Sequence, residues 1–160
     1  KFREKLGADA SHFDAATIID FDPQAPSFGA EGSADVVLTF RNVHNWIEAG
    51  HLDESLQAFH AVLKPGGLLG VEEHRAPPGS SLDWIKKNGY VGEDLLIDRA
   101  RAAGFRLEAR SEVNANPRDT KDHPHGVWSL PPTLRGGELD RERYLAIGES
   151  DRFTHRYVKV

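Results

Sequence analysis

The sequence contains no cysteine and no methionine among its 160 residues. Without cysteine, the chain can form neither a disulfide framework nor a thiolate metal site. It has no apolar run near the ~18 residues that span a bilayer, and no signal-peptide pattern. We therefore expect no membrane partner and a cytoplasmic protein by default, with export as the alternative if a targeting peptide lies upstream. Because position 1 is not methionine and residues 1–6 have the pattern of a helix already under way, we expect the chain to lack its beginning.

Concentrated positive charge is also lacking. The chain has 20 Lys and Arg against 25 Asp and Glu, a net charge of -5, and its basic residues are spread along its length. Binding to nucleic acid requires a basic surface that neutralises phosphates. We therefore expect a small-molecule substrate and no nucleic acid. With 39% hydrophobic and 28% charged residues, the sequence predicts one globular domain over residues 1–160.

Apolar residues are present in runs of strand length and of helical spacing that follow one another along the chain. Short runs or alternation predict strands at residues 16–21, 35–40, 68–73, 105–110 and 153–160. Helical spacing predicts helices at residues 52–63, 93–103 and about 140–147. This order predicts βαβ crossovers in an α/β sheet, closed by an antiparallel strand at a sheet edge.

Two segments carry more specific expectations. Residues 35–40 are apolar on both faces of the predicted strand, which is typical of a sheet covered on both sides. Residues 114 to about 148 begin with a long stretch of little periodicity that is rich in proline, and they form an excursion from the regular elements. Long irregular segments in a compact domain are usually functional or disordered.

These segments resemble the later part of class I S-adenosylmethionine-dependent methyltransferases. Residues 35–46, the following helix, and residues 63–71 are similar to the fourth strand, fourth helix and fifth strand of that family. The Leu-Lys-Pro-Gly-Gly join at residues 63–67 is the most specific part, since proline ends a helix and paired glycines take positive backbone angles. The remainder resembles the sixth and seventh strands. Shorter segments look like a group of bacterial predicted methyltransferases.

The resemblance implies a Rossmann-like α/β sheet with an antiparallel last strand and S-adenosylmethionine as cofactor. The family's first strand, its Gly-rich donor-binding turn and its acidic ribose-binding residue belong upstream of Lys1, so we expect the N-terminal strands to be missing. An exposed sheet edge would then need a cover, which a homo-oligomer would provide. Two rival functions stay open: a non-catalytic binding or assembly domain, and a nicotinamide-dependent oxidoreductase, which an antiparallel last strand disfavours.

The resemblance, together with the rule that open α/β sheets bind ligands beyond the carboxyl ends of their strands, indicates cofactor residues. Asp22 ends the first predicted strand and would accept a hydrogen bond from the adenine amino group, or act only as a turn residue. The next strand end supplies Phe40, Arg41, Asn42 and Val43. For Asn42, helix capping is the structural alternative.

Histidines follow two neighbouring predicted strands, His44 after residues 35–40 and His74 after residues 68–73. They are expected side by side over the sheet and are our candidate catalytic residues. A histidine can take a proton from an oxygen or nitrogen nucleophile because its pKa lies near neutral pH. Methyl transfer to an already nucleophilic atom needs mainly alignment, so the chemistry does not require this base.

The excursion supplies candidate substrate residues that combine donors, acceptors and one large aromatic ring, as suits a small polar molecule. They are Asn114, Asn116, Lys121, His123 and Trp128. Several of them are also ordinary turn formers. His123 and His125 flank a proline, form no helical pair and have no thiolates beside them, so we expect no metal site.

Overall fold

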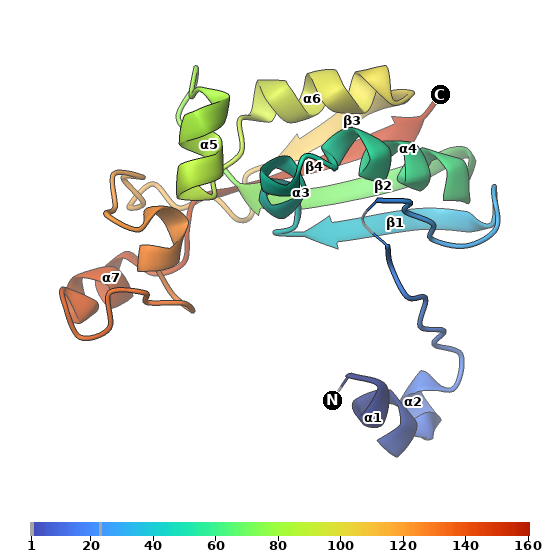
Figure 1. Cartoon of the computed structure of the whole chain (residues 1–160), viewed down its shortest axis with the longest axis horizontal. Coiled ribbons are helices and arrows are strands. Elements are labelled where there is room, and N and C mark those ends of the chain that lie inside the picture. Colours follow the sequence, from blue (N-terminus) through green and yellow to red (C-terminus); the bar gives the residue numbers. More distant parts are fainter. Residues whose placement is uncertain (1, 23) are drawn as a thin grey trace.

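The computed structural model describes residues 2–22 and 24–160. Its centre is a four-stranded sheet in the order β1-β2-β4-β3 (Figure 1). The strands are β1 Ala34–Phe40, β2 Leu63–His74, β3 Phe105–Ser111 and β4 Arg152–Lys159. Strand β1 is parallel to β2, whereas β4 is antiparallel to both β2 and β3. The predicted mixed α/β sheet with an antiparallel last strand is confirmed.

The first two helices precede β1, and the others occupy the connections between the strands. They are α1 Phe2–Ala8, α2 Ala10–Phe13, α3 Val43–Ala49, α4 Leu52–Val62, α5 Leu82–Asn88, α6 Glu93–Ala102, the 3-10 helix η1 Gly126–Ser129 and α7 Arg141–Ile147. The longest, α4 and α6, match their predicted ranges because they repeat the helical spacing over several turns. The sequence did not predict α5, although the Ser81 side chain accepts the Trp84 N–H at its start. No helix among the described residues is long and apolar enough to cross a membrane.

The hydrophobic core lies between the sheet and helices α3 to α6, which cover one face of it (Figure 1). From the sheet, Leu69 and Tyr157 point into this core and are fully buried. From the helices, Leu56 of α4 and Leu96 of α6 meet them and are likewise buried. Each such side chain contributes about 1.5–3 kcal/mol through loss of apolar surface from water. This core holds β1 and β2 side by side.

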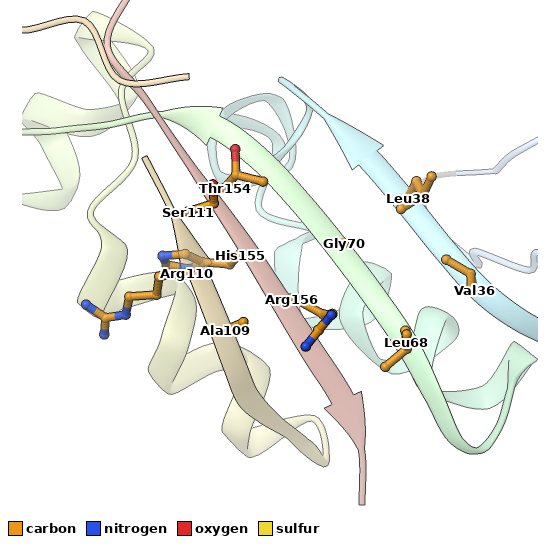
Figure 2. Close-up of a pocket in the computed structure, with 10 residues that line it drawn as sticks. All are labelled: Val36, Leu38, Leu68, Gly70, Ala109, Arg110, Ser111, Thr154, His155 and Arg156. Atoms are coloured by element: carbon orange, nitrogen blue, oxygen red, sulfur yellow. The ribbon is translucent and has the colours of Figure 1, made fainter. Parts of the chain in front are cut away.

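The other face of the sheet is open in the described part of the chain. Val36, Leu38 and Phe40 alternate along β1 toward this face and are 50%, 62% and 57% exposed. The expectation that residues 35–40 are covered on both sides is therefore wrong here. A mainly apolar depression of about 330 Å³ lies on this face and is lined by residues of all four strands, which are drawn in Figure 2. Apolar composition predicted the strand correctly but did not indicate which face would be covered.

Two strand predictions need correction. Residues 16–21 form no strand; Ile19 and Phe21 are 50% and 40% exposed, and the segment connects α2 to the sheet (Figure 1). A β-strand needs a neighbour for its backbone N–H and C=O groups, and this segment pairs with none of the described strands. Strand β4 lies inside the sheet and not at its edge. The alternating sequence of this strand reflects the burial of Phe153 and Tyr157 on the helix side, and it does not indicate whether the strand lies at an edge.

The Lys-Pro-Gly-Gly join works differently from the prediction at one of its glycines. Gly66 has the expected positive φ of 74°. Gly67 is not in that conformation, but a Cβ atom there would lie 2.9 Å from the Lys64 carbonyl oxygen. The first glycine therefore provides a turn near the start of β2, and the second lets the strand pass close to the Lys64 carbonyl.

Candidate functional site

The carboxyl ends of β1 and β2 lie beside each other because these strands are parallel and pair Phe40 with Glu72. Arg41 follows with a positive φ of 54°, and its N–H donates to the Glu72 carbonyl at 2.9 Å. A non-glycine residue in this conformation carries about 1–3 kcal/mol of strain, and such strain clusters at functional sites. The sharp turn directs the chain into α3, so that its first turn lies over the end of β2.

A cavity of about 310 Å³ opens at this edge of the sheet. Its lining combines the strand ends with the excursion and comprises Phe40, Arg41, Asn42, His44, His74, Val127, Trp128, Pro131, Pro132 and Thr133. The volume is at the lower end of the range for small-molecule sites. This cavity gathers titratable and amide groups from the ends of β1 and β2.

Two histidines that line the cavity meet a buried carboxylate behind them. The His44 Nδ1–H donates to Glu73 Oε1 at 3.0 Å, and the His44 backbone N–H donates to Glu73 Oε2 at 3.2 Å. The His74 backbone N–H donates to Glu73 Oε1 at 2.8 Å. The ring centres of His44 and His74 are 5.3 Å apart, as expected from their strand ends. Glu73, whose side chain is fully buried, holds the pair together.

His74 is fixed from its other side by the segment that leads into β4. Its Nδ1 is hydrogen-bonded to the Ser150 hydroxyl at 2.5 Å, and its ring lies edge-on to Tyr90. Burial lowers the pKa of His74 to about 4, although the neighbouring Glu73 opposes this shift. The imidazole of His74 is therefore neutral at pH 7 and presents Nε2 toward Glu73, at 3.9 Å from Oε1.

Of the five residues expected to bind the cofactor, three line the cavity and two do not. Phe40, Arg41 and Asn42 line the cavity. Asn42 precedes α3, but its side chain makes no capping bond to that helix. Val43 is buried in the core. Asp22 is outside the cavity lining and exposed, and its Oδ1 accepts the Gln24 N–H, as in the turn alternative.

Of the five expected substrate residues, Trp128 lines the cavity, with its ring edge-on to His44 at 6.2 Å between centres. The other four make contacts within the excursion or attach it to β4 and the residues that lead into it. Asn114 donates to the Thr154 hydroxyl, and the Asn116 side chain donates to the carbonyls of Ile147 and Glu149. Lys121 pairs with Asp151 at 2.8 Å, and His123 is buried against Asp119.

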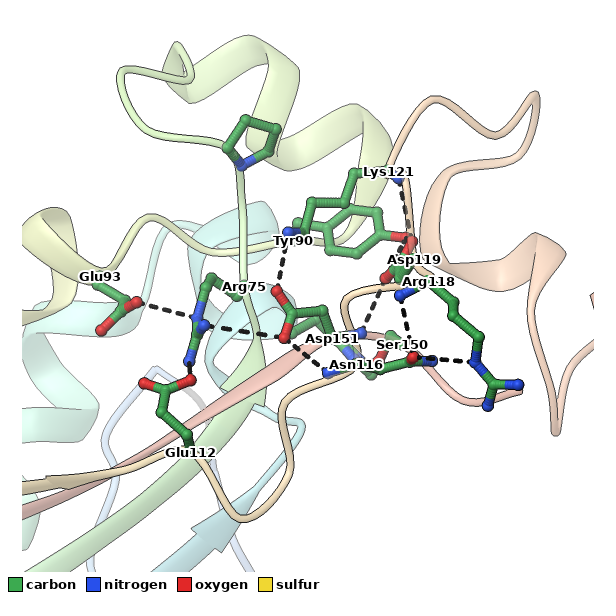
Figure 3. Close-up of polar contacts among 12 residues, drawn as sticks. Arg75, Tyr90, Glu93, Glu112, Asn116, Arg118, Asp119, Lys121, Ser150 and Asp151 are labelled. Atoms are coloured by element: carbon green, nitrogen blue, oxygen red, sulfur yellow. Dashed lines mark hydrogen bonds and ion pairs between the residues drawn. The ribbon is translucent and has the colours of Figure 1, made fainter. Parts of the chain in front are cut away.

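Asp119 is the centre of this attachment, part of which is drawn in Figure 3. Its buried carboxylate accepts the Tyr90 hydroxyl at 3.1 Å, the His123 ring nitrogen at 2.9 Å and the backbone N–H groups of Lys121 and Asp151. Burial and the charge of Asp119 raise the pKa of Tyr90, which therefore remains a hydroxyl donor. Asp119 was not among the sequence candidates, because an aspartate in a polar, proline-rich segment reads as a turn residue.

The excursion also contacts α5 closely at Gly126, which has a positive φ of 55°. A Cβ at this position would overlap with the Asn88 carbonyl oxygen and with the Asn88 Cα. We expect Gly126→Ala to lower the free energy of unfolding by about 2 kcal/mol and to displace the neighbouring Trp128. Urea denaturation and near-ultraviolet circular dichroism measure both effects.

Gly137→Ala is the matched control, because Gly137 has a similar φ of 64° but a Cβ atom there would meet no other atom within 4 Å. Gly137→Ala should lower the free energy of unfolding by about 1 kcal/mol, because it brings the unfavourable backbone conformation of alanine but no steric overlap. Equal losses in the two variants would contradict close packing of Gly126 against α5.

Comparison with known proteins gives a structural result. No family model matches the chain, and no curated protein matches it in sequence. A predicted sarcosine dimethylglycine methyltransferase from Galdieria sulphuraria is similar, with a TM-score of 0.64 and 16% identity over 98% of this chain and 63% of the other. A SAM dependent methyltransferase from Aquifex aeolicus is also similar, with a TM-score of 0.57 and 12% identity over 98% of this chain and 61% of the other.

The [4+2]-cyclase SpnF is a third similar structure, with a TM-score of 0.60 and 18% identity over 95% of this chain and 60% of that one. The chain thus spans about 60% of the length of these proteins. At such identities the likeness concerns the fold alone, and proteins named for different reactions share it.

Proposed function

Given that this chain has the fold of class I S-adenosylmethionine-dependent methyltransferases, we propose that it transfers a methyl group from that donor to a small polar acceptor. The observation that carries the proposal is that His44 and His74, held together by the buried Glu73, line a cavity beyond the carboxyl ends of β1 and β2. Ligands of open α/β sheets bind in this place.

The rim at the end of β1 suits the donor. Phe40 offers an exposed ring for stacking, and Arg41 and Asn42 offer hydrogen-bond donors to a nucleoside or an amino-acid carboxylate. The Asn42 amide is not used to cap α3. When bound, S-adenosylmethionine supplies an electrophilic methyl group on a sulfonium. These residues fit S-adenosylmethionine, because they offer it one aromatic ring for stacking and two polar side chains for hydrogen bonds.

The acceptor is proposed to lie between the histidines and the excursion. Trp128 forms its wall, and the Arg135 guanidinium lies 4.8 Å from the Trp128 ring centre and supports it. An acceptor hydroxyl or amine held beside His44 would give its proton to that imidazole, whose Nδ1–H bond to Glu73 stabilises the resulting cation. Alignment in this cavity supplies the remainder of the catalysis.

The rivals predict different binding. A nicotinamide-dependent oxidoreductase is disfavoured by β4, which is antiparallel and lies inside the sheet. A non-catalytic domain with this fold would bind neither S-adenosylmethionine nor S-adenosylhomocysteine. Binding of the donor therefore separates the proposal from its main rival.

Titration calorimetry of the chain with S-adenosylhomocysteine tests the proposal. We expect micromolar affinity and a loss of at least about tenfold in Phe40→Ala, since base stacking on an aromatic ring contributes about 1–3 kcal/mol. Val36→Ala is the matched control, because Val36 is exposed on the same face of β1 but lies outside the cavity lining. Absence of binding at millimolar ligand by a folded chain would refute donor binding at these residues.

A further inference from the structure

The side chains of His44, Glu73 and His74 form a compact group of metal-ligating atoms, all within 4.8 Å of one another. We propose that these three residues bind a divalent transition-metal ion, such as Zn²⁺, and present it to the cavity. The sequence had led us to expect no metal, because the histidines closest to each other in the chain, His123 and His125, lacked ligand spacing. The group proposed here is assembled from α3 and the end of β2.

The distances suit a first-row ion. Glu73 Oε1 lies 3.0 Å from His44 Nδ1 and 3.9 Å from His74 Nε2. An ion bound at about 2.0–2.1 Å in tetrahedral geometry separates its ligand atoms by roughly 3.4 Å. Shifts of roughly half an ångström would bring these two pairs to that separation, and the two histidine nitrogens, which lie within 4.8 Å of each other, would need to approach by at most roughly 1.4 Å. Two imidazole nitrogens and one carboxylate are ligands that Zn²⁺, Co²⁺ and Fe²⁺ accept.

The charge of Glu73 supports the same inference independently. Its side chain is fully buried, and no lysine or arginine within residues 2–22 and 24–160 forms an ion pair with it. Its partners are the two histidines and their backbone N–H groups. A buried carboxylate without a cation is costly. A bound ion would supply the missing positive charge.

The surrounding contacts orient the ligands as in established metal sites, where a ligand's second polar atom is itself hydrogen-bonded. His74 Nδ1 is held by the Ser150 hydroxyl, which leaves Nε2 for the ion. The His44 backbone N–H holds the second oxygen of Glu73. On binding, the ion displaces the proton between His44 Nδ1 and Glu73, and this proton leaves to solvent.

Three protein ligands leave at least one coordination position toward the cavity, as in catalytic zinc sites. An acceptor with a hydroxyl or carboxylate oxygen would occupy it. Coordination lowers the pKa of a hydroxyl, so its proton would leave to solvent without transfer to His44. This role of the ion rests on the proposed function, whereas binding of the ion does not.

The experiment is a titration of the chelator-treated, dialysed chain with Co²⁺, followed by visible absorption, and with Zn²⁺, followed by calorimetry. We expect one ion per chain, with intense Co²⁺ absorption typical of low coordination number. Glu73→Gln, which keeps the side-chain shape, should weaken binding at least roughly 100-fold, and Ser150→Ala by roughly 10-fold. His51→Ala is the control, because His51 lies outside the cavity lining.

No binding by the unmodified chain, or equal binding by Glu73→Gln and the unmodified chain, would overturn the metal site. The first result needs no variant, so it stands even if Glu73→Gln unfolds. Calorimetry with S-adenosylhomocysteine on the same samples separates the two proposals. Donor binding without metal binding refutes only the ion, and metal binding without donor binding refutes only the methyl transfer.

Discussion

Replacement of Asp119 with alanine should lower the free energy of unfolding by about 3–5 kcal/mol, the cost of leaving buried partners without their charged acceptor. The change removes the acceptor of Tyr90, of His123 and of two backbone N–H groups. Alanine can replace none of these bonds, and the site is closed to water because the Asp119 side chain is fully buried. Urea denaturation followed by circular dichroism measures the loss.

The matched control is Asp122→Ala, three residues along the same segment. The Asp122 side chain is 74% exposed, so water can replace its contacts. We expect the denaturation midpoint of this variant to stay at that of the unmodified chain. If both variants lost the same stability, or neither did, Asp119 would not be the anchor of the excursion.

Replacement of His44 with alanine should lower the rate of methyl transfer by about 10²–10⁴-fold, the usual contribution of a positioned proton acceptor. The rate is measured as release of S-adenosylhomocysteine with an acceptor found by screening small hydroxyl and amine compounds. Affinity for S-adenosylhomocysteine should change little, because the donor is proposed to contact Phe40 and Asn42 instead.

His51→Ala tests whether the effect is specific to His44. His51 precedes α4 and lies outside the cavity lining, so its variant should keep the unmodified rate. A His44→Ala variant with full activity would contradict a role for this histidine in proton transfer or metal binding.

The parts of the fold that the sequence predicted well are those that repeat a pattern. The alternation of residues 105–110 and the helical spacing of 52–63 each report a buried face, and both elements occur as expected. Helices α3 and α5 were not predicted; each has only seven residues, although α7, which is equally short, was expected at about residues 140–147. Residues 16–21 have strand composition, but composition contains no information about a hydrogen-bonding neighbour.

The sequence predicted those residues of the candidate site that are placed by the ends of strands. His44 and His74 were expected side by side because each comes at or shortly after the end of a strand, and their rings are 5.3 Å apart. Glu73 was not chosen, because two consecutive glutamates at a strand end read as solvent-exposed. It is buried because the first turn of α3 folds over it and supplies N–H donors, a contact between residues 29 apart in the sequence. Such a contact has no local signal.

The attachment of the excursion through Asp119 has a kinetic consequence. Because Tyr90, His123 and the backbone of Asp151 hold this segment, the wall that carries Trp128 is in place before any ligand arrives. A ligand that enters a preformed site meets no loop-closure step. In stopped-flow experiments, association should therefore follow a single exponential whose observed rate rises linearly with ligand concentration, and differences in affinity among ligands should lie in their dissociation rates.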